Sequence, residues 1–329
     1  MRKVNAIYLH WPCVDILWRD ILIDVIGGKH NLSEYEPTKP LEPQFAGVEV
    51  LLDLGGRVAC HDMIKASTNL KLWQMITVGY DAVDLNIVDG RSIHVCHCPG
   101  DTSATGLAES AMMFMLMFVK QYQRVQSDVE DGKICNFVID ELDGKVLTIV
   151  GFGASGRKLA HLARAFGMKL IIIEPRDIEP AIVEELGPAF VGKPSKLDEA
   201  ISQADFVSLH LTLSPETQGL FDERLIGLMK PTACFVNVAR AGLVNEEALN
   251  LALMEGRIAG IGSDVFADNK PGKEFSVFGN DGLMALPHIA GTTYGTIRRR
   301  SQVCLENLDR IAQGEEPKYR VPQSPSRIA

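Results

Sequence analysis

Three glycines in the second half of the chain have the spacing of a phosphate-binding turn. Gly151, Gly153 and Gly156 come directly after an apolar run, and a helix is predicted to begin near Ser155. In this pattern the first glycine permits a tight turn, the second lets the backbone approach a pyrophosphate, and the third lets helix and strand pack closely. The pyrophosphate is then expected on the free N–H groups at the start of the helix, where the helix dipole is positive.

A carboxylate follows at the place where such a turn is paired with a ribose. Glu174 ends the next apolar run, about 20 residues after the turn, as the dinucleotide-binding pattern requires. A carboxylate there accepts hydrogen bonds from both ribose hydroxyls and repels a 2′-phosphate, which favours NAD over NADP. Arg176 instead favours NADP, because an arginine nearby can accommodate that phosphate. We expect the chain to bind NAD(H).

Three further side chains with useful chemistry each follow a predicted strand, namely Arg240, Asp264 and His288. The carboxyl ends of parallel strands are where open α/β sheets bind ligands. The planar guanidinium of Arg240 suits a carboxylate, and His288, with an ordinary pKa near neutral, suits proton transfer. Taken singly, Arg240 is better explained as a surface cation and His288 as an isolated histidine beside a proline.

The elements that would position these residues follow from an alternation of short apolar runs with amphipathic stretches, which is typical of a wound parallel sheet. The alternation occurs twice. Strands of the first series are expected at residues 3–10, 48–54, 70–77 and 93–98, and those of the second at 145–150, 169–174, 206–210, 233–238, 259–263 and 283–286. Long helices are expected at residues 104–124, between the two series, and at 292–313.

Length and composition indicate a globular protein of two domains, with 329 residues of which 46% are hydrophobic and 23% charged. The net charge of -9 argues against nucleic-acid binding, which needs a basic face. The seven scattered cysteines suit reduced thiols in the cytoplasm. The most apolar run, residues 111–119, is shorter than the roughly 20 residues of a membrane span, so we expect a buried helix and no membrane partner.

Six separated segments together resemble the D-isomer-specific 2-hydroxyacid dehydrogenase family. They occur in the family's order and read VGYDAVDL, CPGDTSATGLAESAMMFML, DELDGKVLTIVGFGASG, HLTLSPETQGLF, LMKPTACFVNVARAGLVNEEAL and ALPHIAGTT. The resemblance implies an α/β fold in which a Rossmann NAD-binding domain, residues 103–287, is inserted into a smaller flavodoxin-like substrate-binding domain, residues 1–102 and 288–329. It also implies an active site in the cleft, a small-molecule substrate and a homodimer paired through the nucleotide domains.

The resemblance assigns roles to individual residues. Arg240 matches the arginine that grips the carboxylate and carbonyl oxygen of a 2-keto acid, and His288 matches the general acid that protonates that oxygen as a hydride arrives from NADH. Asp264 matches a residue near the nicotinamide carboxamide, whereas Val78 and Gly79 would offer N–H groups to the substrate carboxylate. Further cofactor contacts are expected near the strand ends, from His210, Thr212, Val238 and Ala239.

The chain departs from the family at the residue that supports the histidine. Asn269 stands where the family has a glutamate that raises the histidine's pKa, and Asp268 could substitute if the loop is shifted. Two alternatives follow. Formate dehydrogenases resemble this family, carry an amide there and protonate no carbonyl. The family also includes a corepressor that senses NADH without catalysis. A second departure, Thr77 for a usual glycine, is expected to reshape the carboxylate pocket.

One cluster of potential metal ligands, His94, Cys96, His97 and Cys98, has poor spacing for zinc. Alternate residues of a strand point to opposite faces, so we expect a buried strand and no metal site.

Overall fold

The chain divides into two compact units. In this computed structural model, unit 1 comprises Met1–Thr102 with Thr293–Ala329, and unit 2 comprises Ser103–Thr292. The structure describes residues 2–11, 16–80, 83–88, 90–134, 138–267, 280 and 282–321. The first division falls after Thr102, where the sequence analysis put it, and the second falls after Thr292 rather than after residue 287. His288 therefore belongs to unit 2.

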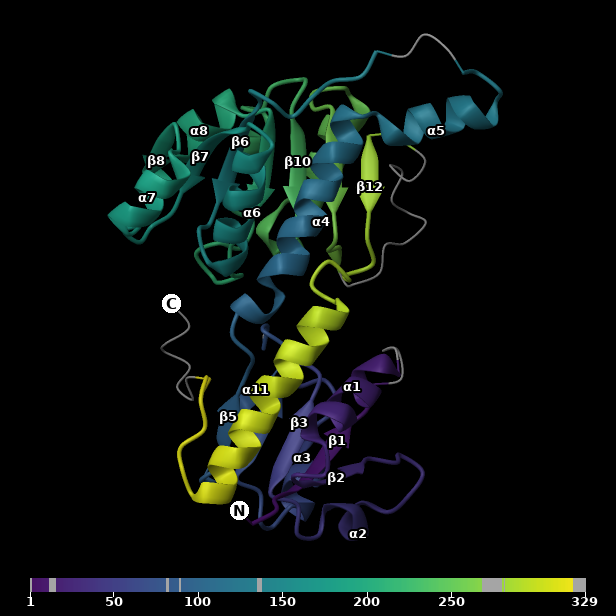
Figure 1. Cartoon of the computed structure of the whole chain (residues 1–329), viewed down its shortest axis with the longest axis vertical. Helices are drawn as coiled ribbons and strands as arrows, with labels where there is room; N and C mark the ends of the chain where they lie inside the picture. The colour runs from purple at the N-terminus through teal and green to yellow at the C-terminus, as the bar shows by residue number, and fades with distance from the viewer. Residues whose placement is uncertain are drawn as a thin grey trace. The chain divides into compact units, whose positions relative to one another are not determined.

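Unit 1 is built on a parallel sheet of five strands in the order β2-β1-β3-β4-β5. The strands are β1 (Asn5–Leu9), β2 (Asn31–Glu34), β3 (Val50–Asp53), β4 (Leu72–Met75) and β5 (His94–Cys96). The helices are α1 (Leu17–Ile26), α2 (Leu41–Phe45), α3 (His61–Ala66), the 3-10 helix η1 (Leu85–Val88) and α11 (Tyr294–Gln313). Figure 1 shows α1 and α11 side by side across one part of this unit.

Both faces of this sheet are covered, and side chains of β1 alternate between them. Ala6 and Tyr8 pack into a core with residues of α1 and α11, whereas Ile7 and Leu9 pack into a second core with residues of α2 and α3. This is the period of two that a strand imposes. A strand buried on both faces reads as a continuous apolar run, which is why β1 was recognisable in the sequence.

Unit 2 contains a parallel sheet of seven strands in the order β12-β11-β10-β9-β6-β7-β8. The strands are β6 (Val146–Val150), β7 (Lys169–Ile173), β8 (Phe190–Gly192), β9 (Phe206–Leu209), β10 (Cys234–Asn237), β11 (Gly260–Ser263) and β12 (Leu283–Ala285). The chain order reverses at β6, which lies between β7 and β9. Such a switch point is where doubly wound sheets bind ligands.

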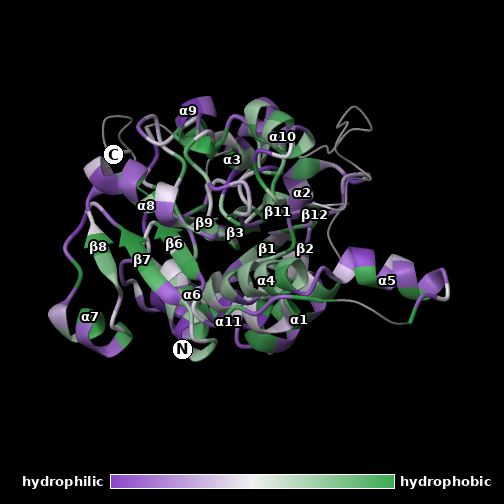
Figure 2. Ribbon diagram, turned by 90° about the horizontal axis from the view of Figure 1, so that it is seen from above, coloured by the Kyte–Doolittle hydropathy of each residue, from purple (hydrophilic) through white to green (hydrophobic). Residues whose placement is uncertain are grey.

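Helices cover both faces of this second sheet. They are α4 (Asp101–Val119), α5 (Tyr122–Glu130), α6 (Ala154–Ala165), α7 (Pro180–Leu186), η2 (Pro194–Lys196), α8 (Leu197–Gln203), α9 (Glu223–Ile226), η3 (Ala241–Leu243) and α10 (Glu246–Met254). One core includes side chains of α4, α6 and α7, and the other includes side chains of α8, α9 and α10. Figure 2 shows β6 and β7 in the hydrophobic colour, whereas α5 is mostly hydrophilic.

The single helix predicted over residues 104–124 is wrong, because the chain forms two helices there. Gln121 has a φ of 46°, in the left-handed region, and ends the helical path between α4 and α5. By length and composition alone α4 could cross a membrane. Its Phe114 and Met115 are buried in the core of unit 2, and Gly262 of β11 leaves room for the Phe114 ring. These are the contacts of a core helix.

The predicted fold class is confirmed, and every strand expected from the sequence forms. Two strands, β2 and β8, were not predicted. Both are edge strands of three or four residues, and β2 is polar and largely exposed. A short strand with one open edge buries too little apolar surface to leave a hydrophobic pattern.

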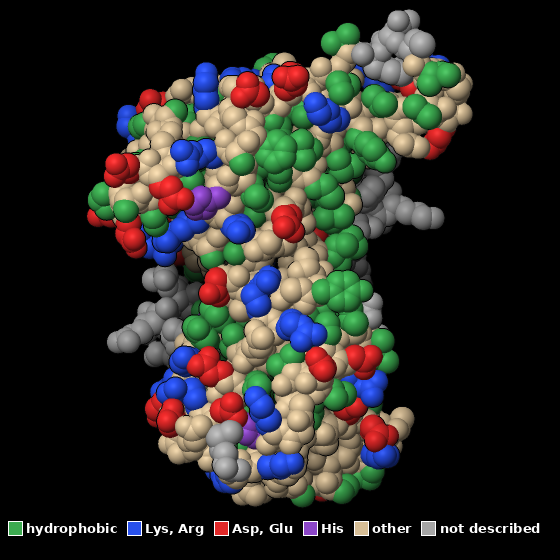
Figure 3. Space-filling view, in the orientation of Figure 1, with side chains coloured by type: hydrophobic (Ala, Val, Ile, Leu, Met, Phe, Trp, Pro, Cys, Tyr) green, Lys and Arg blue, Asp and Glu red, His purple; other side chains and the backbone are tan. Residues whose placement is uncertain are grey.

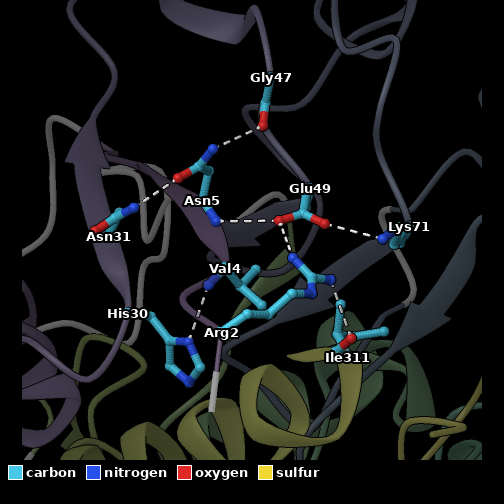
Figure 4. A network of polar contacts seen from close by, with 9 residues as sticks. All are labelled: Arg2, Val4, Asn5, His30, Asn31, Gly47, Glu49, Lys71 and Ile311. Atoms are coloured by element: carbon cyan, nitrogen blue, oxygen red, sulfur yellow. Dashed lines mark hydrogen bonds and ion pairs between the residues drawn. The ribbon is translucent and has the colours of Figure 1, made fainter. Parts of the chain in front are cut away.

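A partly buried carboxylate, Glu49, ties together the amino ends of three strands in unit 1 (Figure 4). Glu49 accepts hydrogen bonds from Arg2 Nη1 at 2.7 Å, from Lys71 Nζ at 2.9 Å and from the Asn5 backbone N–H at 3.4 Å. Burial raises the pKa of Glu49, but the bonds from Arg2 and Lys71 outweigh it and hold the pKa at about 2. Glu49 is therefore ionised at neutral pH.

We predict that Glu49→Gln destabilises the protein by about 1–3 kcal/mol at neutral pH, because the carboxylate charge and one of the two accepting oxygens are lost. A depressed carboxyl pKa adds stability above the unfolded pKa, near 4.5, and loses it as the pH falls toward about 2. The deficit of the variant should therefore shrink over that window. Urea unfolding at several pH values measures it, with Glu36→Gln, an exposed member of a surface pair, as the control. A deficit that does not change with pH would contradict the assignment.

Candidate nucleotide and active site

The glycine turn of unit 2 is packed on one side and open on the other. Gly151 has a φ of 92°, and a Cβ on it would lie 2.6 Å from the His210 carbonyl oxygen. A Cβ on Gly156 would lie 2.3 Å from the Gly151 carbonyl oxygen, whereas a Cβ on Gly153 would meet nothing within 4 Å. The first glycine thus permits close packing before α6 and the third within its first turn, whereas the second borders open space. This geometry fits a pyrophosphate.

Glu174 is buried at the end of β7 and already holds the glycine turn. Its Oε2 accepts the Phe152 N–H at 2.7 Å, and its Oε1 accepts Arg176 N at 3.2 Å and Nε at 2.6 Å. Burial raises its pKa, but these hydrogen bonds and the Arg176 charge bring the pKa below the ordinary value. The carboxylate is therefore ionised, and Oε2 keeps a lone pair for a ribose hydroxyl. The guanidinium of Arg176 is engaged by Glu174 itself.

His210 joins the end of β9 to the start of α6 through two serine hydroxyls. Its Nδ1 lies 3.0 Å from Ser155 Oγ, and its Nε2 lies 3.0 Å from Ser208 Oγ. Burial lowers the pKa of His210 to about 4, so the imidazole is neutral and donates to one serine while it accepts from the other. Ser208 was not singled out from the sequence, because a serine inside an apolar strand carries no distinctive signal. Thr212, further along, is exposed.

The loop after β10 carries Arg240 and is shaped by an asparagine that sequence reasoning missed. Asn237 Nδ2 donates to the Arg240 carbonyl oxygen at 2.9 Å, and its Oδ1 accepts the Ala239 N–H at 3.0 Å. Arg240 Nη1 donates to the Ala239 carbonyl oxygen at 2.8 Å. Val238 is buried below this loop. The last residue of the strand thus holds the backbone on which Arg240 stands.

The aspartate after β11 holds the backbone that follows His288. Asp264 is only 1% exposed, and its two oxygens accept the N–H groups of Ile289 at 2.7 Å and Ala290 at 3.0 Å. His288 has a φ of 59°, a left-handed conformation that is uncommon for a residue other than glycine and persists only where the surroundings enforce it. The His288 side chain is exposed. Burial raises the pKa of Asp264 to about 6.

In unit 1, the turn after β4 carries Val78 and Gly79. Thr77 Oγ1 donates to the Gly79 carbonyl oxygen at 2.7 Å, and His97 Nδ1 lies 3.0 Å from the Val78 carbonyl oxygen. The rings of Tyr80 and His97 pack edge to face, 5.0 Å apart. Side chains therefore hold the two carbonyl groups of the turn. Thr77, which the sequence analysis marked as a departure from the family, donates one of these hydrogen bonds.

Asn269 and Asp268 lie outside the described residues, so the support of His288 by position 269 stays a prediction. Of the cysteines and histidines near residue 96, Cys96 and Cys98 are buried in unit 1. Among the residues that the structure describes, no three ligand-type side chains are placed to hold a metal ion.

Comparison with known proteins identifies the family. A model of the D-isomer specific 2-hydroxyacid dehydrogenase NAD binding domain matches residues 112–290. The glyoxylate reductase of Thermococcus onnurineus is 32% identical over 304 residues, which cover 90% of this chain and 88% of the relative. The hydroxypyruvate reductase of Thermotoga maritima is 32% identical over 283 residues, which cover 85% and 89%. The crystal structure of a glyoxylate reductase from Paecilomyes thermophila has a TM-score of 0.78 and 26% identity, over 98% of this chain and 99% of that one.

These findings agree with the resemblance of the separate segments and with the geometry of the glycine turn. They confirm the prediction of NAD as the cofactor and of an oxidoreductase that transfers a hydride between NAD(H) and a small 2-hydroxy or 2-keto acid. The chain belongs to the D-isomer specific 2-hydroxyacid dehydrogenase family.

Proposed function

We propose that this enzyme reduces a small 2-keto acid to the D-2-hydroxy acid, with Arg240 as the substrate-binding cation and His288 as the proton donor. The observation that carries the proposal is the register of three neighbouring strands. β10, β11 and β12 are adjacent and parallel, so the residues that follow them, Arg240, Asp264 and His288, come after the carboxyl ends at one edge of unit 2. The glycine turn follows β6 at the same edge.

Each residue has a role that suits its chemistry. Bound NADH supplies the hydride, and the glycine turn with Glu174 would hold its pyrophosphate and adenosine ribose. The planar fork of donors of the Arg240 guanidinium matches the geometry of a carboxylate. His288 in its protonated form gives a proton to the carbonyl oxygen. Val78 and Gly79 would offer backbone N–H groups to the substrate carboxylate.

We assign Asp264 a positioning role that differs from the expected contact with the nicotinamide carboxamide. Both of its oxygens are used by backbone N–H groups directly after His288, in a segment with a strained φ. A buried carboxylate that accepts hydrogen bonds from two backbone N–H groups holds the chain in this conformation. Asp264 would thereby fix where the imidazole of His288 stands.

The two alternatives are less well supported. The relatives that cover most of this chain are named for reduction of glyoxylate and hydroxypyruvate, which are 2-keto or 2-oxo acids whose carbonyl must be protonated. Formate oxidation and NADH sensing without turnover rest on Asn269 alone.

We also propose a cytoplasmic homodimer. Five described cysteines are free thiols, namely Cys60, Cys96, Cys98, Cys234 and Cys304, which suits a reducing compartment. In unit 2, α5 stands apart from the sheet and buries none of its residues (Figure 1). Tyr122 and Val129 of this helix are more than half exposed, and hydrophobic side chains gather over α4 (Figure 3). A cavity of about 460 Å³ beside the end of α4, lined in part by Phe118, would take apolar side chains of the second copy.

The catalytic proposal is tested by Arg240→Ala with NADH and either glyoxylate or hydroxypyruvate. We expect kcat/KM to fall about 100-fold or more, because charge-assisted bonds to the substrate carboxylate are lost. NADH affinity, measured by fluorescence, should not change. Arg224→Ala removes an exposed arginine of the same unit and serves as the control. Undiminished turnover in the Arg240 variant would contradict the proposal.

Asp264→Asn separates the two roles of that residue. One accepting oxygen becomes an NH2 group that cannot accept, so the backbone after His288 shifts, and we expect kcat to fall by about 100-fold with NADH affinity unchanged. Since the pKa of Asp264 is about 6, kcat of the wild type should also decline as the pH falls through that value, whereas the variant should show no such decline. Weaker NADH binding with an unchanged kcat would instead assign Asp264 to the cofactor.

The homodimer is tested by sedimentation. We expect twice the 36.1 kDa mass of one chain, and the combined change Tyr122→Glu with Val129→Glu should give the single mass because it places charge on the exposed apolar positions. Gln126→Glu adds charge to a polar position of the same helix and should leave the dimer intact. A wild-type protein that sediments as one chain contradicts this proposal.

A further inference from the structure

A row of three hydrogen-bonded side chains, Ser208, His210 and Ser155, runs from inside the sheet of unit 2 to the start of α6. Ser208 Oγ lies 3.0 Å from His210 Nε2, and His210 Nδ1 lies 3.0 Å from Ser155 Oγ. Ser208 is fully buried in β9, whereas Ser155 is half-buried in the first turn of α6. The row therefore links the interior of the sheet to the helix end proposed to hold the pyrophosphate.

The glycine turn allows these side chains to meet. His210 N donates to the Val150 carbonyl oxygen at 2.8 Å, which continues the pairing of β9 with β6. Gly151 follows Val150, and a Cβ on it would lie 2.6 Å from the His210 carbonyl oxygen. A side chain there would push the end of β9 away from the turn. Gly151 is therefore needed for the close approach of His210 to Ser155.

The buried hydroxyl of Ser208 fixes the direction of both hydrogen bonds. Burial lowers the pKa of His210 to about 4, so the ring is neutral and carries a proton on one of its two nitrogens. Within the part of the chain that the structure describes, the hydrogen-bond partner of the Ser208 hydroxyl is His210 Nε2. A hydroxyl proton that is buried without an acceptor is costly. Ser208 therefore donates to Nε2, and the ring proton is on Nδ1.

Ser155 accordingly accepts the bond from His210, and its own hydroxyl proton is left to point toward a ligand. Ser155 is the second residue of α6, and helical side chains lean toward the N-terminal end of their helix. Space is open at that end, because a Cβ on Gly153 would meet nothing within 4 Å. With the ring proton on Nε2 instead, Ser155 would donate to the ring and could not donate to a ligand.

We propose that the Ser155 hydroxyl donates a hydrogen bond to the pyrophosphate of NAD(H), and that His210 and Ser208 are positioning residues that keep this hydroxyl a donor. The inference rests on the proposed function, which places the pyrophosphate at the glycine turn. It adds a side-chain donor to the backbone N–H groups there. A hydrogen bond to a charged oxygen is stronger than one between neutral groups, so its loss should be measurable in the affinity.

NADH affinity, measured by fluorescence, tests the role of Ser155. We expect Ser155→Ala to raise the dissociation constants of NADH and of ADP-ribose about tenfold, because both carry the pyrophosphate and one charge-assisted bond is lost. Adenosine, which has no phosphate, should compete with NADH as before. Ser155→Thr retains a hydroxyl and should keep most of the affinity. Ser202→Ala removes an exposed hydroxyl that bonds to a carbonyl of its own helix, α8, and serves as the matched control.

The positioning role is tested by Ser208→Ala, which removes a buried hydroxyl that cannot touch the coenzyme. We expect the dissociation constant of NADH to rise about threefold, because the ring proton is no longer confined to Nδ1. In the Ser155→Ala background the same change should add little, since both act through one hydroxyl. NMR of isotopically labelled histidine should show the Nδ1–H tautomer for His210, whose signal is identified by its loss in His210→Phe.

Any of three results would overturn this inference. They are an unchanged NADH affinity in Ser155→Ala, a full effect of Ser208→Ala in the Ser155→Ala background, and the Nε2–H tautomer at His210.

Gly153→Val distinguishes a failure of this inference from a failure of the proposed function. The φ of Gly153 is -74°, which suits other residues, and the new side chain would enter the open space. We expect this variant to bind NADH about tenfold more weakly or worse. Weaker binding here with full affinity in Ser155→Ala would leave the pyrophosphate at the turn and overturn only the role of Ser155. Full affinity in both variants would overturn the placement of the pyrophosphate as well.

Discussion

A buried carboxylate that accepts backbone N–H groups is the interaction on which the functional loops depend. Asp264 holds the amides of Ile289 and Ala290, and Glu174 holds the amide of Phe152 in the glycine turn. In unit 1, Asp53 holds the amide of Ala59. Each carboxylate stands at or directly after the end of a parallel strand, where loops must turn with their polar backbone partly removed from water. An accepting oxygen supplied by the strand satisfies those N–H groups and fixes the loop at the same time.

Carboxyl groups removed from water have a raised pKa at one position and a lowered pKa at others. Asp264 meets only neutral amide donors, and burial raises its pKa to about 6. Glu174 also meets the guanidinium of Arg176, and its pKa lies below the ordinary value. Glu49, with Arg2 and Lys71, is the extreme case, with a pKa of about 2. A cation beside such a carboxylate therefore decides whether it is firmly ionised, and of Asp264, Glu174 and Glu49 it is Asp264 whose protonation falls in the range of mild acid.

The strands and the nucleotide turn could be predicted because their signals are local. A strand buried on both faces must be apolar throughout, and a backbone that approaches a pyrophosphate must lack a side chain at Gly153. Edge strands β2 and β8 gave no such signal, and the break at Gln121 could not be foreseen from a sequence that reads as helix on both sides. Of the site, the types and order of Arg240, Asp264 and His288 were readable. Asn237 and Ser208 were not, because an amide or hydroxyl near a strand end looks like any loop residue until its partners are known.

By itself, the sequence determined that this chain forms two wound parallel sheets and binds NAD, and that Arg240, Asp264 and His288 follow successive strands. Tertiary structure alone decided how those groups are held: that both oxygens of Asp264 serve the backbone after His288, that Ser155 and Ser208 hold a neutral His210, and that Arg57 stands on Trp11. The physical reason is distance along the chain. Glycine and apolar patterns reflect constraints within a few residues, whereas each of these contacts joins residues from separate strand ends that only the folded sheet brings within hydrogen-bond or ring-contact distance.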